Sequence, residues 1–374
     1  MPLDRTSAPL VSAWIGEGNY GDELMALGLR GLLHKEFGIE RLNYYQAGGF
    51  GITVDPWVRV STLRSPGNSI QEKILSYFAI PRHDLLLYGG GSIFHSENSI
   101  AWKHTLLRRY RRFKKNKPAG AVGISVGPFP TEAARRQCGK FFNELDFIVC
   151  RDAESASMAA AMTSGGKVSL CGDLALLVPH LFEQEMPDPA CRKPDLVGMS
   201  FLKRKADQTF FEHHRLVEGF QKILDSVILS GKKVRLFTFC LSPQMEDATL
   251  NEYLRSNSLA SERVEIYSFN GNVFETMAQC NECSSFISMR LHGLITAYIL
   301  NIPMISIGYN PKNFYFMNMI GAPQEVSLSW ETPSLAADVL QRLDKVNVTA
   351  PLTLQKGMKP EQVRKILYAA LSHG

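Results

Sequence analysis

The sequence lacks the features that mark several classes of protein. Its seven cysteines are few for 374 residues and odd in number, so we expect reduced thiols rather than a disulfide framework. The N-terminus, residues 1–5, has no basic flank followed by an apolar run, so no signal peptide is expected. No stretch reaches about 18 uninterrupted apolar residues, which excludes a spanning helix. These absences predict a cytoplasmic protein.

The composition is that of an ordinary globular protein. The hydrophobic fraction is 45% and the charged fraction 21%, which excludes a disordered or fibrous chain. The net charge of +5 is compatible with an anionic partner but does not require one. Because domains average roughly 150 residues, the length predicts two of them.

Short apolar runs alternate with helical patterns along the chain. The runs predict strands at residues 10–15, 84–88, 119–126, 146–150, 196–201, 234–240, 264–267, 285–289 and 304–307. The helical patterns cover residues 23–37, 70–78, 99–115, 131–143, 210–229 and 360–371. This alternation predicts parallel sheets covered by helices, and no internal repeat is visible.

One proline-rich stretch breaks the alternation. It predicts a linker at residues 181–195 between domains at 1–180 and 196–374. The helix predicted at 360–371 can pack on either half. The fold class we expect is α/β, with two Rossmann-like domains facing across a cleft, and ligands in such folds bind at the carboxyl ends of the strands.

The first predicted strand runs into a glycine-rich segment and then a helix. Residues 16–23, GEGNYGDE, have the spacing G-x-G-x-x-G, but Asn19, Tyr20 and Asp22 are more polar than a dinucleotide fingerprint would have there. Glycines let the backbone approach a ligand, and a helix start offers N–H groups to an anion. The alternative is a tight turn into the helix, capped by Asp22.

A second glycine cluster follows the strand predicted at 84–88. Gly89, Gly90 and Gly91 precede Ser92, and together they indicate a backbone surface shaped for a flat or anionic ligand. The alternative is a sharp chain reversal. Both readings place a turn directly after the strand.

Cationic side chains follow predicted strands in both halves. Arg290 and His292 stand where a strand gives way to an apolar helix, and Lys312 and Arg151 each follow another strand. Two arginines, a histidine and a lysine predict a clamp for a ligand with two or three negative charges. For Arg151 the alternative is a surface residue paired with a neighbouring acid.

Six short motifs run through the chain in order. They are GNYGDE at 18–23, GGGSIF at 89–94, RDAES at 151–155, GDLA at 172–175, RLHG at 290–293 and YNPK at 309–312. Together they resemble the polysaccharide pyruvyl transferases over residues 16–312. One difference is Asn310, where that family commonly has an aspartate, so no role for an acid is carried over to it.

The resemblance implies a two-domain fold like that of the GT-B glycosyltransferases. It implies transfer of pyruvyl from phosphoenolpyruvate to two hydroxyls of a sugar, in a cell-surface polysaccharide or its precursor, to form a ketal. Binding of phosphoenolpyruvate is thereby assigned to Arg151, Arg290, Leu291 and His292, with Lys312 beside them. We expect no metal and no cofactor besides this donor substrate. Further substrate contacts are predicted for Asn19, Gly90, Gly91, Ser92 and His95.

The chemistry suits these residue types. An acid must protonate the methylene carbon of phosphoenolpyruvate, and a base must accept a hydroxyl proton. Asp22, at a helix start that favours its ionised form, is the candidate base or an acceptor contact. His292 is the candidate acid, with His95 and Glu97 as alternatives, and Arg290 is the third catalytic candidate.

The segment at residues 103–117 holds eight Lys or Arg residues and no acid, with leucine and aromatic residues interleaved. Such a basic amphipathic helix can lie on an anionic membrane surface. That would bring the protein to lipid-linked glycans at the inner face of the membrane. The alternative is an outer helix in solvent whose aromatic residues face the sheet.

Other readings of the sequence predict different functions. Cys280 and Cys283 have a zinc-like spacing but no second pair, so we interpret them as structural thiols. A GT-B glycosyltransferase using a nucleotide sugar is a second enzyme hypothesis. A non-enzyme hypothesis is binding of nucleic acid or another anionic surface through residues 103–117, but the modest net charge and the absence of a known module argue against nucleic acid.

Overall fold

The computed structural model describes residues 8–45, 58–63, 80–203, 210–242, 245, 247–346, 363–366, 368 and 369. Contacts divide them into two compact units. The described residues of Met1–Glu17, Asp22–Glu183 and Met358–Gly374 form unit 1, and those of Gly18–Gly21 and Gln184–Gly357 form unit 2.

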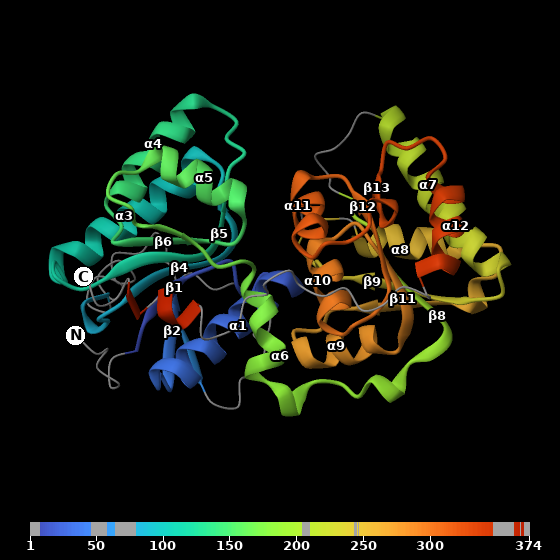
Figure 1. The fold of residues 1–374 in the computed structure, drawn as a ribbon, viewed down its shortest axis with the longest axis horizontal. Coiled ribbons are helices and arrows are strands. Elements are labelled where there is room, and N and C mark those ends of the chain that lie inside the picture. The colour runs from blue at the N-terminus through green and yellow to red at the C-terminus, as the bar shows by residue number, and fades with distance from the viewer. Residues whose placement is uncertain are drawn as a thin grey trace. The chain divides into compact units, whose positions relative to one another are not determined.

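Unit 1 is a parallel sheet of seven strands with helices on both faces. The strands run in the order β3-β2-β1-β4-β5-β6-β7, and Figure 1 shows α3, α4 and α5 on one face and α1 on the other. The strands are β1 Leu10–Ser12, β2 Arg41–Tyr45, β3 Arg59–Leu63, β4 Leu86–Phe94, β5 Ala119–Val126, β6 Phe147–Cys150 and β7 Val168–Leu170. The helices are α1 Tyr20–Phe37, α3 Glu97–Phe113, α4 Glu132–Asn143, α5 Ala153–Met162 and α6 Val178–Leu181. The strand order reverses between β1 and β4, and such a switch point is the usual ligand position in this architecture.

Unit 2 is a parallel sheet of six strands in the order β10-β9-β8-β11-β12-β13. The strands are β8 Lys193–Ser200, β9 Lys233–Thr238, β10 Val264–Ser268, β11 Cys283–Ser288, β12 Met304–Gly308 and β13 Ser327–Ser329. The helices are α7 Phe210–Leu229, α8 Asp247–Ser256, α9 Val273–Asn281, α10 Leu291–Ile299, α11 Pro311–Met319 and α12 Leu335–Val346. Its switch point lies between β8 and β11. Two parallel α/β sheets confirm the predicted fold class.

The glycine cluster departs from its prediction. The turn expected at residues 89–92 is wrong, because β4 continues through it to Phe94. Gly91 pairs with Ile124, and the register shifts before Phe94. Gly90 and Gly91 have φ values of +64° and +81°, a conformation that only glycine adopts freely. The result is a bulge, which bends the strand and re-aims the residues next to it.

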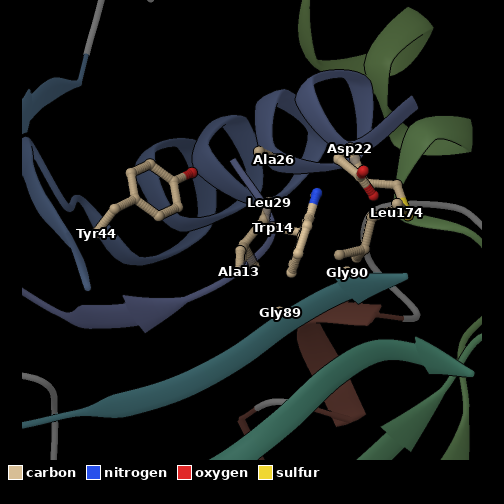
Figure 2. A pocket seen from close by; sticks show the side chains of 10 residues that line it. Ala13, Trp14, Asp22, Ala26, Leu29, Tyr44, Gly89, Gly90 and Leu174 are labelled. Atoms are coloured by element: carbon tan, nitrogen blue, oxygen red, sulfur yellow. The ribbon is translucent and has the colours of Figure 1, made fainter. Parts of the chain in front are cut away.

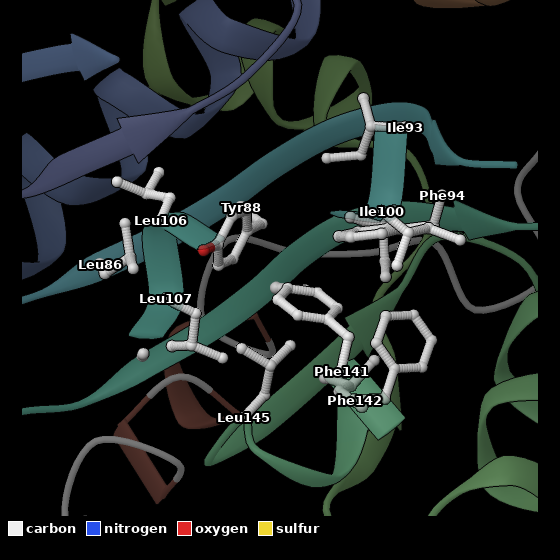
Figure 3. Close-up of a cluster of buried hydrophobic side chains, with 14 of the residues drawn as sticks. Leu86, Tyr88, Ile93, Phe94, Ile100, Leu106, Leu107, Phe141, Phe142 and Leu145 are labelled. Atoms are coloured by element: carbon white, nitrogen blue, oxygen red, sulfur yellow. The ribbon is translucent and has the colours of Figure 1, made fainter. Parts of the chain in front are cut away.

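The core of unit 1 lies between β4 and β5 on one side and α3 and α4 on the other. Figure 3 shows aromatic side chains of β4 and α4 meeting in it, and Tyr88, Phe94, Phe141 and Phe142 are each fully buried. A fully buried side chain of this kind contributes about 1.5–3 kcal/mol relative to leaving it exposed. This packing fixes β4 and thereby the position of its glycine bulge.

The two units exchange segments of the chain near its ends. The contact division falls between Glu183 and Gln184, and β8 begins at Lys193, earlier than the strand predicted at 196–201. At the C-terminus, the described helical residues 363–366, 368 and 369 group with unit 1. Arg364 lies 3.2 Å from Glu36, which ties this segment to α1. The helix predicted at 70–78 lies outside the described residues.

Candidate active site

The segment Gly18–Gly21 groups with unit 2, although the residues before and after it belong to unit 1. Asn19 forms an antiparallel bridge with Cys240, and the N–H of Tyr20 donates to the carbonyl of Phe239 at 2.9 Å. The Asn19 side chain accepts from the N–H of Gly21 at 3.1 Å, which caps the start of α1. The predicted cap at Asp22 is therefore wrong, because α1 begins two residues earlier, at Tyr20.

Tyr20 anchors this segment in the core of unit 2. Its ring is fully buried and stacks on Phe239 with the ring centroids 4.9 Å apart. Its hydroxyl lies 2.8 Å from that of Thr296, which itself donates to the carbonyl of His292 at 2.7 Å. Tyr20 must therefore donate to Thr296, and burial raises the pKa of its hydroxyl well above the ordinary value, so it keeps that proton. The chain of two hydrogen bonds ends at the backbone of His292.

Gly21 lies directly against the imidazole of His292. A methyl group at Gly21 would overlap Nδ1 of His292 and would lie 2.8 Å from Cε1. Since atoms cannot approach this closely, any side chain at residue 21 must displace the imidazole. The Asn-Tyr-Gly segment at residues 19–21 therefore packs against a predicted catalytic residue. The hydrogen bonds of Tyr20 to Phe239 and Thr296 hold the segment in this position.

Arg290 stands at the carboxyl end of β11, directly before α10. Its Nε donates to Oδ2 of Asp247 at 2.7 Å, and its Nη2 lies 2.5 Å from the same oxygen. The Asp247 side chain is fully buried and that of Arg290 is 13% exposed. The carboxylate holds one edge of the guanidinium.

Burial and pairing act on the charges of this pair in opposite directions. Burial raises the pKa of Asp247, and the Arg290 guanidinium works against that rise. Burial alone would lower the pKa of Arg290, but Asp247 raises it above the ordinary value. Arg290 therefore carries its positive charge at neutral pH, held at the switch point of unit 2.

Lys312 lies in the first turn of the next helix, α11, and is half-buried. Asn310 caps this helix by accepting from the N–H of Lys312 at 3.2 Å. An aspartate would serve equally well as a cap, so the exchange to asparagine preserves the helix start. Asn313, fully buried, donates to the carbonyl of Met289 at 2.7 Å. That bond ties α11 to the residue before Arg290.

Arg151 follows β6 in unit 1 and is buried, with 5% of its side chain exposed. It donates to Asp173 at 3.1 Å, to Ser125 at 2.6 Å and to Ser92 at 3.3 Å, and its Nη1 lies 3.8 Å from Sδ of Met25. These contacts occupy four of the five N–H groups of a guanidinium. The surface reading of Arg151 is wrong, because its main partner is the equally buried Asp173.

The structure brings the other predicted residues of unit 1 to the same strand ends. Gly91 is close enough to Asp22 that a methyl group on it would lie 3.3 Å from the Asp22 carboxylate. Ser92 is exposed, and its carbonyl lies 2.9 Å from Nδ1 of the exposed His95. Glu97 begins α3 and accepts from the hydroxyl of Thr131 at 2.7 Å.

Comparison with known proteins identifies the family. A family model described as polysaccharide pyruvyl transferase matches residues 19–311. The chain belongs to the polysaccharide pyruvyl transferase family. A curated relative, the amylovoran biosynthesis protein AmsJ of Erwinia amylovora, is 23% identical over 266 residues, which are 66% of this chain and 62% of AmsJ. The chain thus matches under two thirds of the length of that relative.

Solved structures with the same fold include UDP-GlcNAc 2-epimerases. The enzyme from Methanocaldococcus jannaschii matches with a TM-score of 0.62 at 9% identity, covering 97% of this chain and 100% of its own. S. aureus MnaA, solved with UDP, matches with a TM-score of 0.62 at 12% identity over 98% and 97% of the two chains. TarM matches with a TM-score of 0.51 at 9% identity over 80% and 58%. These likenesses support a GT-B-like fold for this pyruvyl transferase family member.

Two buried carboxylates of this chain were not predicted as site residues. Asp173 lies in the GDLA motif, so the sequence marked its position. Nothing in the sequence indicated that Asp173 pairs with Arg151. Asp247 lies in no motif and follows a stretch with few apolar residues, so nothing in the sequence marked it. Both carboxylates are recognised in the structure by their ion pairs with Arg151 and Arg290.

Part of the basic segment at residues 103–117 is paired with acids. Arg111 lies 2.7 Å from Asp146, and Lys114 and Lys117 lie 2.8 Å and 3.2 Å from Asp84. Leu106, Leu107 and Tyr110 of α3 are buried, as the alternative reading expected, whereas Phe113 is exposed. This pairing reduces the charge available to an anionic surface, and membrane binding stays a prediction. No helix among the described residues is long and apolar enough to cross a membrane.

Lys103 of the same segment is 3% exposed, with Nζ 4.2 Å from the centre of the Trp102 ring. Burial lowers the pKa of Lys103 to about 7. An unfolded lysine titrates near 10.4, so between these values the unfolded chain holds a proton that the native chain lacks, and stability rises with pH.

We expect the free energy of unfolding of Lys103→Met, relative to wild type, to fall by up to about 1.4 kcal/mol per pH unit above pH 7. Urea unfolding at pH 7, 8 and 9 measures it. The exposed Lys115→Met is the control and should show no such trend. An equal pH dependence in the two variants would contradict the expectation.

The cysteine pair lies in the core of unit 2. Cys280 and Cys283 are buried, at the end of α9 and the start of β11, and burial raises the pKa of Cys283 to about 12. Across the described ranges, no group of three or more His, Cys, Asp or Glu residues could hold a metal ion.

Proposed function

We propose that this chain transfers the pyruvyl group of phosphoenolpyruvate to two hydroxyls of a sugar, forming a cyclic ketal and releasing phosphate. The sugar belongs to a cell-surface polysaccharide or its precursor. Membership of the family supports pyruvyl transfer, and the relative named for amylovoran biosynthesis supports an exopolysaccharide. The protein would act in the cytoplasm, where this donor is available.

The observation that carries the proposal is Arg290 held by buried Asp247 at the switch point of unit 2. Two of its nitrogens, Nε and Nη2, face the carboxylate, which fixes the orientation of the guanidinium. Lys312 adds a second cation at the start of α11, and α10 and α11 both begin beside these residues. Cations and helix N-termini together suit a donor with a carboxylate and a phosphate.

The reaction delivers one proton to C3 and one to the departing phosphate, and it removes one proton from each of the two hydroxyls. We assign delivery to His292, through the ring edge away from Gly21, so that C3 becomes a methyl group and C2 becomes electrophilic. The first sugar hydroxyl adds to C2, and Asp22 takes its proton. The bond from C2 to the phosphate oxygen then breaks, and the second hydroxyl adds to C2. The two hydroxyl protons replace the one given to C3 and the one that leaves on inorganic phosphate.

On unit 1 we assign acceptor contacts to the strand ends around the β4 bulge. Gly90 and Gly91 leave backbone without side chains beside Asp22, and Ser92 and His95 present exposed polar groups there. Arg151 would support this rim through Ser92, with a single N–H left for a direct substrate contact.

Replacement of Arg290 by lysine tests the donor assignment. Lysine keeps the charge but cannot hold two contacts to Asp247 and present a third donor, so we expect the KM for phosphoenolpyruvate to rise at least about tenfold. Phosphate release with glycan acceptors measures it. Arg255→Lys, on a partly exposed arginine of α8, is the control and should leave this KM unchanged.

The same variant distinguishes the nucleotide-sugar hypothesis. We expect phosphoenolpyruvate to raise the melting temperature of wild type, and Arg290→Lys to reduce that rise. UDP-GlcNAc should leave the melting temperature unchanged. A rise with UDP-GlcNAc but not with phosphoenolpyruvate would favour a glycosyltransferase and overturn the proposal.

A further inference from the structure

A tryptophan lies exposed at the carboxyl end of the central strand of unit 1. Trp14 follows β1 by two residues, and 53% of it is exposed. Trp102 and Trp330, the other tryptophans in the described ranges, are half-buried. Exposing so large an apolar ring to water is unfavourable, and an exposed indole face can pack against the apolar face of a ligand.

Trp14 lies at the switch point of its sheet. β1 and β4 are neighbours there. The sheet extends from β1 through β2 to β3 on one side, and from β4 through β5 and β6 to β7 on the other. Figure 2 shows Trp14 beside a narrow pocket with Asp22 and Gly90. Leu29 and Leu174 form apolar walls of the same pocket. One exposed aromatic face and one carboxylate therefore border a single hollow.

The dimensions of this hollow decide how a ligand can use it. Its volume is about 10 Å³, which is room for about one water molecule. A larger ligand must therefore lie at the mouth, on the exposed face of Trp14, with only a polar substituent reaching inwards to Asp22. A flat ring with hydroxyls on its edge fits this description.

We propose that Trp14 is a stacking platform for a pyranose ring of the acceptor glycan. The C–H groups on one face of such a ring are weakly positive and pack on the negative face of the indole. The ring's hydroxyls then lie beside the Asp22 carboxylate, which accepts hydrogen bonds from them. This inference rests on the proposed function for the identity of the ligand.

Binding without donor tests the platform independently of the pyruvyl reaction. Titration of wild type with the methyl glycosides of glucose, galactose and mannose should change the tryptophan emission with at least one of them. Trp14→Phe should keep the binding, seen by saturation-transfer NMR, and lose the emission change. Trp14→Ala should lose both. Tyr253→Ala, at an equally exposed ring on α8, should behave as wild type.

Each outcome decides the matter. If no glycoside binds wild type, or if Trp14→Ala binds as wild type does, the platform is refuted. In the kinetic assay, Trp14→Ala should raise the acceptor KM at least tenfold with the KM for phosphoenolpyruvate unchanged. An unchanged acceptor KM overturns the platform alone. Glycoside binding that needs Trp14, without phosphate release from phosphoenolpyruvate, would overturn the proposed function and leave the platform standing.

Discussion

Gly21→Ala is expected to lower kcat for pyruvyl transfer by about 10²–10⁴-fold, as much as His292→Asn. The methyl group would overlap the imidazole, and that ring must turn away because the backbone of residue 21 is fixed in the first turn of α1. The fold should persist, since alanine is a better helix residue than glycine. Phosphate release at saturating donor measures the loss.

Three controls test whether the loss of turnover in Gly21→Ala comes from displacement of His292. Gly219→Ala, on α7 with open space around it, should retain full turnover. Both variants should keep the circular-dichroism melting curve of wild type. The double variant Gly21→Ala with His292→Asn should lose no more than His292→Asn alone, because both changes remove one function. Wild-type turnover in Gly21→Ala would show that His292 does not act as assigned.

Arg151→Met is expected to destabilise unit 1 by about 3–5 kcal/mol, because it leaves Asp173 as a buried charge without its partner. Asp173→Asn should cost a similar amount by stranding Arg151. The double variant should recover part of the loss, since a buried pair replaced as a whole leaves no unpaired charge. Urea unfolding followed by circular dichroism measures these changes.

Arg135→Met provides the matched control in the same unit. Arg135 lies 3.8 Å from Glu132, and both side chains are about half exposed. Exposed pairs contribute about 0–1 kcal/mol, so this variant should stay close to wild type. Equal losses from Arg151→Met and Arg135→Met would mean that the buried pair has no special importance for stability.

The alternation of apolar runs and helical patterns was enough to predict the fold class. Long, strongly patterned elements such as α7 and β5 coincide with their predicted ranges. The short strands β2, β3, β7 and β13 were missed, because a run of three to five partly exposed residues differs little from loop sequence. Three of them, β3, β7 and β13, are edge strands, so sequence patterns located the sheets but missed most of their edges.

The candidate site was predicted in its residue types but not in its contacts. Arginine after a buried strand is unusual enough to be recognised, which is why Arg290 and Arg151 were found. Their partners Asp247 and Asp173 are distant in the chain, and only the folded sheet brings them together. The glycine bulge was read as a turn because local sequence does not reveal that β5 continues to pair alongside it.

The crossing of Gly18–Gly21 into unit 2 limits how this chain can be divided. A gene fragment encoding residues 184–374 would lack Tyr20, so the Phe239 ring would lose its stacking partner and Thr296 a hydrogen bond. A recombinant hybrid that takes its second half from a relative would also pair a foreign surface with the native Asn-Tyr-Gly segment. In evolution, substitutions at residues 18–21 should accordingly vary together with those around Phe239 and His292, although more than two hundred positions separate them.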